Sequence, residues 1–190
     1  MTAYRRAVRF IAAPYFFWAL LALPAVLLVY NYVRGATFHG ELMHASGETG
    51  ARLLIAALAV TPLRLMLPRA GWVRWLARQR RYLGVAACGY SLLHAVVYVE
   101  RKGDVAAIVA DALAIAMWTG WLALLVMLIL AVTSNDFSVR RLRGGWKWLH
   151  RTVYAAAVLT FAHWILSAFD PIPGAIHLGG IAALEGYRLW

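Results

Sequence analysis

Two histidines stand inside stretches of sequence that are apolar enough to cross a membrane. His94 lies in the run 82–99 and His163 in the run 152–169, and neither run contains a fixed charge. Burying a polar side chain in hydrocarbon costs free energy unless it has a partner, so such residues indicate function. His94 follows Tyr82 by 12 residues, and His163 follows Thr152 by 11. At about 1.5 Å per residue, both lie roughly 17–18 Å from the start of their run, so we expect them at one depth.

Two imidazoles at one depth on facing helices can bind a metal ion, share a proton, or provide both axial ligands of a haem. A zinc site needs further ligands, and we expect no acidic residue or cysteine at that depth. Small residues lie within helical turns of both histidines, which leaves room for a flat macrocycle and also serves helix packing. They include Gly84, Ala87 and Ser91 near His94, and Ala155, Ala156, Thr160 and Ser167 near His163. Haem b is therefore the favoured ligand.

His150 and Arg80 indicate a second level in the same helices. Arg80 precedes His94 by 14 residues, which on an ideal helix returns within about 40° of the same face, about 21 Å away. His150 precedes His163 by 13 residues, about 20 Å, but the ideal helix misses that face by roughly 140°. His150 must therefore lie before a regular helix begins, follow a local unwinding, or serve something other than a second site.

Several membrane-spanning helices are needed to bring these residues together. The 190-residue chain is 63% hydrophobic and 14% charged, and its apolar residues form long runs, as in integral membrane proteins. The runs predict one all-α domain over residues 1–190, a six-helix transmembrane bundle with haem between its third and fifth helices. The second run is short and contains Arg64, and the sixth is marginal because it contains Glu185. The six predicted spans are Phe10–Val33, Leu53–Leu67, Tyr82–Val99, Ala112–Val132, Thr152–Phe169 and Ile172–Leu189.

The net charge of +11 suggests nucleic-acid binding, but the distribution of the charge argues against it. With a cytoplasmic N-terminus, fifteen Lys and Arg residues fall on the inner side and four on the outer side. Such an excess sets the orientation of membrane proteins, so we expect both termini inside, and no nucleic-acid partner. The inner residues are Arg5, Arg6, Arg9, Arg64, Arg69, Arg74, Arg78, Arg80, Arg81, Arg140, Arg141, Arg143, Lys147, Arg151 and Arg188; the outer ones are Arg34, Arg52, Arg101 and Lys102.

Few other chemical motifs occur in the sequence. The single cysteine, Cys88, allows neither an intramolecular disulfide nor a thiolate cluster, and the absence of CxxCH excludes the usual covalent attachment of haem. Neither a Gly-rich phosphate loop nor an HExxH motif is present. His39 and His44 fall in the expected outer loop, residues 34–52, and His177 falls near the start of the sixth span.

Several segments resemble one known family. They are RQRRYLGVAACGYSLLHAVVY at 78–98, LAVTS at 130–134 and RRLRGGWKWLHRTVYAAAVLTFAHW at 140–164, supported by HASGETGARLL at 44–54 and AVTPLR at 59–64. Together they are similar to the MsrQ (YedZ) family, the haem-binding membrane subunits of the periplasmic protein-methionine-sulfoxide reductase system, within the ferric-reductase-like transmembrane superfamily. The segment LRGGWKW departs from the family, since a basic residue is expected after the first glycine.

The resemblance implies a cytochrome b of the bacterial inner membrane that transfers electrons and performs no substrate chemistry of its own. Electrons would come from a cytoplasmic flavin reductase or the quinone pool. They would pass to a periplasmic molybdopterin-containing partner that reduces oxidised methionine. The resemblance also implies FMN as a further cofactor.

The resemblance also assigns individual residues. His94 and His163 match the pair that ligates the haem nearer the periplasm, and His150 matches a histidine toward the cytoplasm. Two-haem relatives have a histidine where this chain has Arg80. Arg80 would therefore either complete an unusual second haem site or pair with a haem propionate or a flavin phosphate.

Three alternatives are open at this point, and one of them is a structural assembly subunit that binds no cofactor. A ferric reductase of the same superfamily carries a cytoplasmic FAD and NAD(P)H domain, which we do not expect here. A proton-coupled or metal transporter would use His94, His163 and Asp111, because intramembrane ionisable residues also mark ion pathways. The colour of the purified protein separates these classes, since a haem b protein shows a Soret band and a transporter does not.

Overall fold

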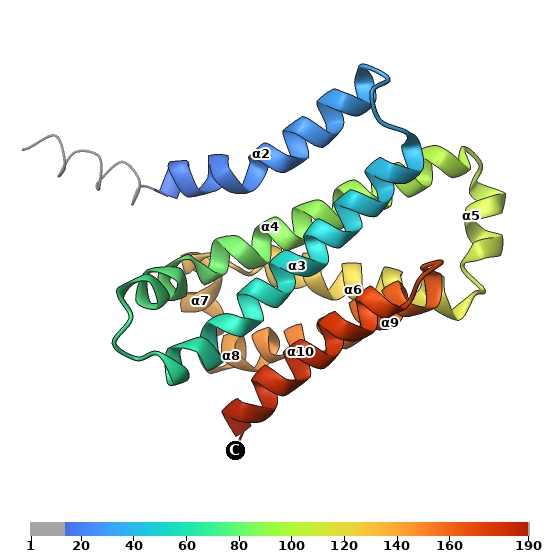
Figure 1. Cartoon of the computed structure of the whole chain (residues 1–190). Coiled ribbons are helices and arrows are strands. Elements are labelled where there is room, and N and C mark those ends of the chain that lie inside the picture. The colour runs from blue at the N-terminus through green and yellow to red at the C-terminus, as the bar shows by residue number, and fades with distance from the viewer. Residues whose placement is uncertain (1–13, 190) are drawn as a thin grey trace, which may run out of the picture.

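The computed structural model describes residues 14–189, which form helices joined by short turns, with no strand in that range (Figure 1). The all-α fold class is confirmed. The predicted start of the first span at Phe10 and the basic residues Arg5, Arg6 and Arg9 lie outside the described residues. The helices are α2 (Pro14–Val33), α3 (His39–Met66), α4 (Gly71–Lys102), α5 (Val105–Asp111), α6 (Ile115–Val132), α7 (Asp136–Leu142), α8 (Gly144–Arg151), α9 (Val153–Ser167) and α10 (Ile172–Leu189).

Two antiparallel helix pairs form the centre of the molecule. α3 and α4 pack along much of their length, as do α6 and α9 (Figure 1). The pairs lie side by side, because α4 contacts α6 and α3 contacts α9. α2 packs on α3 and α4, while α10 packs on α3 and α9. We name the two ends of this bundle the Pro68 end and the Gly103 end, after the turns that follow α3 and α4.

Local chemistry explains why α3 and α4 end where they do. α3 ends just before Pro68, which cannot donate a backbone hydrogen bond and disfavours helical backbone at the residue before it. α4 ends at Lys102, and the next residue, Gly103, has a φ of +64°, in the left-handed region that glycine enters without steric cost. Its N–H donates to the carbonyl of Val99, which satisfies one of the free carbonyls at the helix end.

Four described helices are long and apolar enough to cross a membrane. These segments are Tyr15–Val33, His39–Met66, Gly71–Lys102 and Ile115–Val132. α9 has only 15 residues, and α10 carries Glu185 and Arg188, so neither meets the same standard. The two charges of α10 form an ion pair of 2.8 Å, and Arg188 also donates to the hydroxyl of Tyr154 on α9. The six-span count remains a prediction.

The second predicted span, Leu53–Leu67, is wrong in its start. α3 begins at His39, so His39 and His44 lie in the first turns of a helix rather than in a loop. The charged residues Glu48 and Arg52 ended the apolar run in the sequence, but they form an i, i+4 ion pair of 2.7 Å on the helix surface. This pairing lets the helix continue toward the Gly103 end.

The connections that the predicted spans leave between them at 68–81 and 133–151 are also largely helical. α4 already begins at Gly71, and α7 and α8 fill most of the second connection. The side chain of Asn135 caps α7 by accepting from the N–H of Ser138 at 2.8 Å. Asp136 pairs with Arg81 of α4 at 2.6 Å, and the Arg81 guanidinium lowers the pKa of that carboxyl. This ion pair ties α7 to α4.

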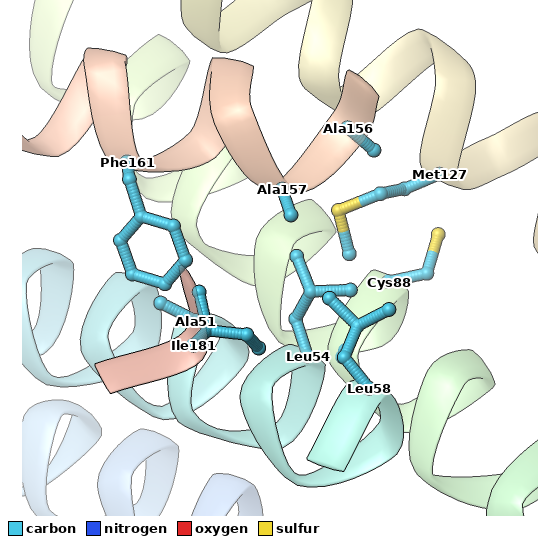
Figure 2. Close-up of a cluster of buried hydrophobic side chains, with 10 residues drawn as sticks. Ala51, Leu54, Leu58, Cys88, Met127, Ala156, Ala157, Phe161 and Ile181 are labelled. Carbon is cyan, nitrogen blue, oxygen red and sulfur yellow. The ribbon is translucent and has the colours of Figure 1, made fainter. Parts of the chain in front are cut away.

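The main hydrophobic core lies where five helices meet. Figure 2 shows side chains from α3, α4, α6, α9 and α10 converging on one cluster. Phe161 and Ala156 of α9 are fully buried, and Met127 of α6 packs beside Cys88 of α4 (Figure 2). Several of the residues are alanines, which let the helices approach closely, as is common in membrane bundles. This core fixes α4 and α9, the helices that carry His94 and His163.

Candidate cofactor site between two helix pairs

His94 and His163 lie next to each other, as the sequence predicts. His94 comes from α4 and His163 from α9, and their ring centroids are 6.1 Å apart with the ring planes at 82°. A metal ion bound to both imidazoles at about 2 Å from each nitrogen would hold the ring centres roughly 6 Å apart. The distance between the two ring centroids therefore matches the one that a shared ion requires.

Each of the two histidines is fixed by a hydrogen bond to the backbone of another helix. The Nδ1 of His94 lies 2.8 Å from the carbonyl oxygen of Met43 on α3, and the Nδ1 of His163 lies 2.7 Å from that of Ala116 on α6. A carbonyl only accepts, so Nδ1 must carry the proton in both rings. The same tautomer leaves Nε2 of each ring as an unprotonated nitrogen, which is the form that ligates a metal.

A cavity of about 440 Å³ surrounds the pair. This volume falls in the range of roughly 300–1,000 Å³ that is typical of small-molecule and cofactor sites. Toward the interior its walls are small or apolar, with Ala51, Ala123 and Met127 among the lining residues. Toward the Gly103 end the lining includes Arg101 and Lys102. The cavity is therefore apolar around the imidazoles, and its charged lining residues are Arg101, Glu48 and Lys102, of which Lys102 is paired with Asp111. The Arg101 guanidinium suits a flat apolar group that carries a carboxylate.

Lys102 also belongs to a polar cluster beside the cavity. Its ammonium lies 2.5 Å from the carboxylate of Asp111, and the hydroxyl of Tyr98 donates to the same carboxylate at 2.9 Å. The bond from Lys102 and then that from Tyr98 lower the pKa of Asp111. Asp111 lies at the end of α5, outside the long apolar helices, and is engaged by two partners. This placement argues against its use as an intramembrane carrier of protons or metal ions.

His150 and Arg80 have different hydrogen-bond partners, and His150 lines neither of the two cavities described for this structure. The ring of His150 stacks on Trp146 with centroids 3.9 Å apart, and its Nε2 lies 3.2 Å from the hydroxyl of Thr133. Burial lowers the pKa of His150, and the nearby Arg81 and Arg80 lower it further, while hydrogen bonding to Thr133 acts in the opposite direction. Arg80 instead donates through Nε to the carbonyl of Ala57 at 3.0 Å.

Arg80 lines a separate, smaller cavity near the Pro68 end. This cavity measures about 220 Å³, and Thr61 and Arg64 of α3 also line it. His150 is not part of its wall. The charges of Arg80 and His150 nevertheless influence each other, so the two residues lie in one region of the molecule. In this arrangement Arg80 bonds the carbonyl of Ala57, and His150 bonds the hydroxyl of Thr133.

The other histidines have separate structural partners. The Nε2 of His39 lies 2.8 Å from the carbonyl of Val97, and its Nδ1 lies 3.1 Å from the hydroxyl of Tyr32, so it joins α2, α3 and α4. The Nδ1 of His177 lies 2.6 Å from the carbonyl of Pro173 in its own helix. His44 lines the larger cavity near Glu48. Among residues 14–189, no three His, Cys, Asp or Glu side chains cluster closely enough to hold a bare metal ion.

Comparison with known proteins gives one consistent result. The family model described as "Ferric reductase like transmembrane component" matches residues 17–161. The chain is 38% identical to the protein-methionine-sulfoxide reductase heme-binding subunit MsrQ of Ralstonia nicotianae, over 91% of this chain and 82% of that protein. It is 39% identical to the MsrQ of Rhizobium meliloti, over 79% and 71%, and 34% identical to that of Xanthomonas axonopodis pv. citri, over 82% and 72%. No solved structure matches it significantly.

Proposed function

Since the chain belongs to the MsrQ family of heme-binding subunits, within the ferric-reductase-like transmembrane proteins, we propose that it carries electrons across a membrane through haem b held by His94 and His163. The observation that carries this proposal is the paired imidazole geometry. Both rings have Nδ1 tied to a backbone carbonyl, and their centres are 6.1 Å apart at the wall of one cavity.

The residues around the cavity have distinct tasks in this proposal. His94 and His163 would hold the haem iron, and the carbonyls of Met43 and Ala116 keep those rings in the ligating tautomer. The apolar wall, including Ala51 and Met127, excludes water and lowers the local dielectric constant, which helps to set the potential. Arg101 supplies a cation for a carboxylate at the Gly103 end. When bound, the haem supplies reversible one-electron transfer.

The wider system is proposed from the family. The chain would lie in the bacterial inner membrane with both termini in the cytoplasm. Its electrons would come from a cytoplasmic flavin reductase or the quinone pool and pass to a periplasmic, molybdopterin-containing methionine-sulfoxide reductase. The Pro68 end offers exposed arginines, among them Arg74, Arg78 and Arg140, to an acidic donor protein. We propose no substrate chemistry for this chain itself.

A second cofactor near the Pro68 end belongs to the same proposal. The chain offers Arg80 with Arg64 and Thr61 at the smaller cavity, a chemistry that suits a phosphate such as that of FMN. His150 would hold a second haem only if its contacts with Trp146 and Thr133 were exchanged for an iron ligand. The flavin is therefore the better match for these residues.

Haem content and spin state of the purified chain test the main proposal. The wild-type protein should show a Soret band, a haemochrome assay should give haem b, and the spectrum should be low-spin. Replacing His94 or His163 by Ala should remove most of the haem or make it high-spin, because one axial position is left open. His177→Ala is the matched control, since His177 bonds its own helix, and it should retain the wild-type spectrum.

His150→Ala distinguishes the site of His94 and His163 from the second site, near the Pro68 end. It should spare the low-spin signal and slow electron entry from the cytoplasmic side. If His94→Ala kept a full low-spin spectrum while His150→Ala lost it, the assigned ligand pair would be wrong. A colourless wild-type protein would reject the electron-transfer proposal altogether.

A further inference from the structure

The two helix pairs present the same local arrangement around each histidine. His94 bonds the carbonyl of Met43, four residues before Gly47 on α3. His163 bonds the carbonyl of Ala116, four residues before Gly120 on α6. In both pairs, therefore, a glycine stands one helical turn beyond the carbonyl that holds the ring.

Both glycines lie directly against the imidazoles. A Cβ atom at Gly47 would lie 2.8 Å from Nδ1 and 3.1 Å from Cε1 of His94. A Cβ atom at Gly120 would lie 2.8 Å from Nδ1 and 2.9 Å from Cε1 of His163. Carbon atoms in van der Waals contact are about 3.5–4.0 Å apart, so a methyl group at either position would push the ring away. The rings can bond the backbone only because these two positions carry no side chain.

We propose that Gly47 and Gly120 are positioning residues that set the orientation and ligand strength of the two histidines. The proposal rests on the proposed function of His94 and His163 as haem ligands. An imidazole that donates Nδ1–H to a carbonyl is held in one tautomer and is a more basic ligand at Nε2. A more basic ligand stabilises the oxidised iron, so the two glycines keep the reduction potential low.

Other glycines of the chain supply matched controls. Gly50, one turn along α3 from Gly47, is also crowded, since a Cβ there would lie 3.2 Å from the hydroxyl of Ser91 and 3.3 Å from the carbonyl of Ala87. Gly89 lies on α4, the helix of His94, and no atom lies within 4 Å of a Cβ placed there. Gly50→Ala therefore perturbs helix packing without contacting His94 or His163. Gly89→Ala should change neither the helix packing nor the surroundings of the two histidines.

The experiment compares Gly47→Ala, Gly120→Ala, Gly50→Ala and Gly89→Ala in the full-length, haem-loaded protein. Potentiometric titration and EPR spectra are the measurements, because the potential follows ligand basicity and the EPR signal follows the angle between the imidazole planes. Gly47→Ala and Gly120→Ala should raise the potential and change the low-spin signal or convert part of it to high-spin. Gly89→Ala should match the wild type, and Gly50→Ala should lower thermal stability with the potential unchanged.

A double substitution covers the case in which Gly47→Ala accumulates poorly. If Gly47 acts through His94, Gly47→Ala should cost stability in the wild-type background and little in a His94→Ala background, where no ring remains to meet the methyl group. Equal cost in both backgrounds would overturn the proposal. So would wild-type potentials and EPR spectra in both glycine variants, provided that His94→Ala and His163→Ala lose haem or turn it high-spin. If the histidine variants keep a full low-spin haem spectrum, the proposed function itself fails.

Discussion

Asp111 is bound by Lys102 and Tyr98 beside the cavity, and these two contacts predict that the stability of the fold depends on pH. Lys102 and Tyr98 lower the pKa of its carboxyl. A carboxyl whose pKa is lower in the folded state stabilises the fold above its ordinary pKa of about 3.9, and that contribution is lost as the pH falls through the lowered value. The ion pair is therefore fully formed at neutral pH and fails only in acid.

Asp111→Asn should lower the melting temperature at pH 7 by about 1–3 °C, since the pair is partly exposed. The difference from the wild type should shrink as the pH is lowered below 4. Thermal unfolding in detergent across this pH range measures both. In a Lys102→Met background the same substitution should cost less, and an undiminished cost there would show that Lys102 is not its partner.

Single residues also show where the sequence is and is not informative about the site. The depth argument for His94 and His163 needs only the rise of a helix, and it placed the two rings side by side. Gly47 and Gly120 gave no such signal, because spacing along one helix does not reveal which glycine faces a ring on another. Arg80 and His150 share a level by the same arithmetic, yet their side chains bond different partners.

At the scale of elements, α2 contains a proline, and a side-chain hydroxyl from α4 bonds the backbone groups near it. Pro24 lies inside α2, and near it the hydroxyl of Tyr90 accepts from the N–H of Ala25 and donates to the carbonyl of Leu21, both at 2.9 Å. An α-helix normally joins these two groups directly, so the hydroxyl bridges the backbone near the proline. Tyr90 is buried on α4, which fixes α2 against the central pair.

Tyr90→Phe should destabilise the protein by about 1–2 kcal/mol, because it leaves backbone groups without their partner in an apolar environment. Unfolding in mixed micelles of detergent and denaturant measures the change. Tyr187→Phe, in a side chain that is 47% exposed, is the control and should have little effect. If both variants unfolded alike, the bridging bond would contribute nothing to stability.

Helix boundaries were the least predictable feature of the elements. The apolar run of the second span excluded Glu48 and Arg52, whereas the helix includes them as an i, i+4 ion pair. The angular mismatch between His150 and His163 was informative, since α8 ends at Arg151 and α9 begins at Val153. His150 thus precedes the helix of His163, one of the options that the sequence left open.

At the scale of the whole molecule, the two ends of the bundle differ in charge. The Pro68 end carries exposed arginines from α3, α4, α7 and α8, with Asp136 as an acidic partner of one of them. The Gly103 end has Arg34, Arg101 and Lys102, together with several acidic residues, among them Glu41, Glu100, Asp104 and Asp111. Cytoplasmic segments of membrane proteins are rich in Lys and Arg, so this asymmetry predicts a cytoplasmic Pro68 end.

Cysteine labelling tests this orientation. Glu41 lies in the first turn of α3 at the Gly103 end, Arg74 lies in the first turn of α4 at the Pro68 end, and both are exposed. The native Cys88 is only 2% exposed, so it should not react with the labelling reagent. Glu41→Cys and Arg74→Cys can therefore be introduced without first replacing Cys88.

A membrane-impermeant maleimide added from the periplasmic side should label position 41 and miss position 74, and both should react once the membrane is opened. The reverse pattern would place the basic end in the periplasm. The cavity that opens toward Arg101 and Lys102 would then face the cytoplasm, so the same labelling result decides whether the ligand pair lies on the side of the proposed periplasmic electron acceptor.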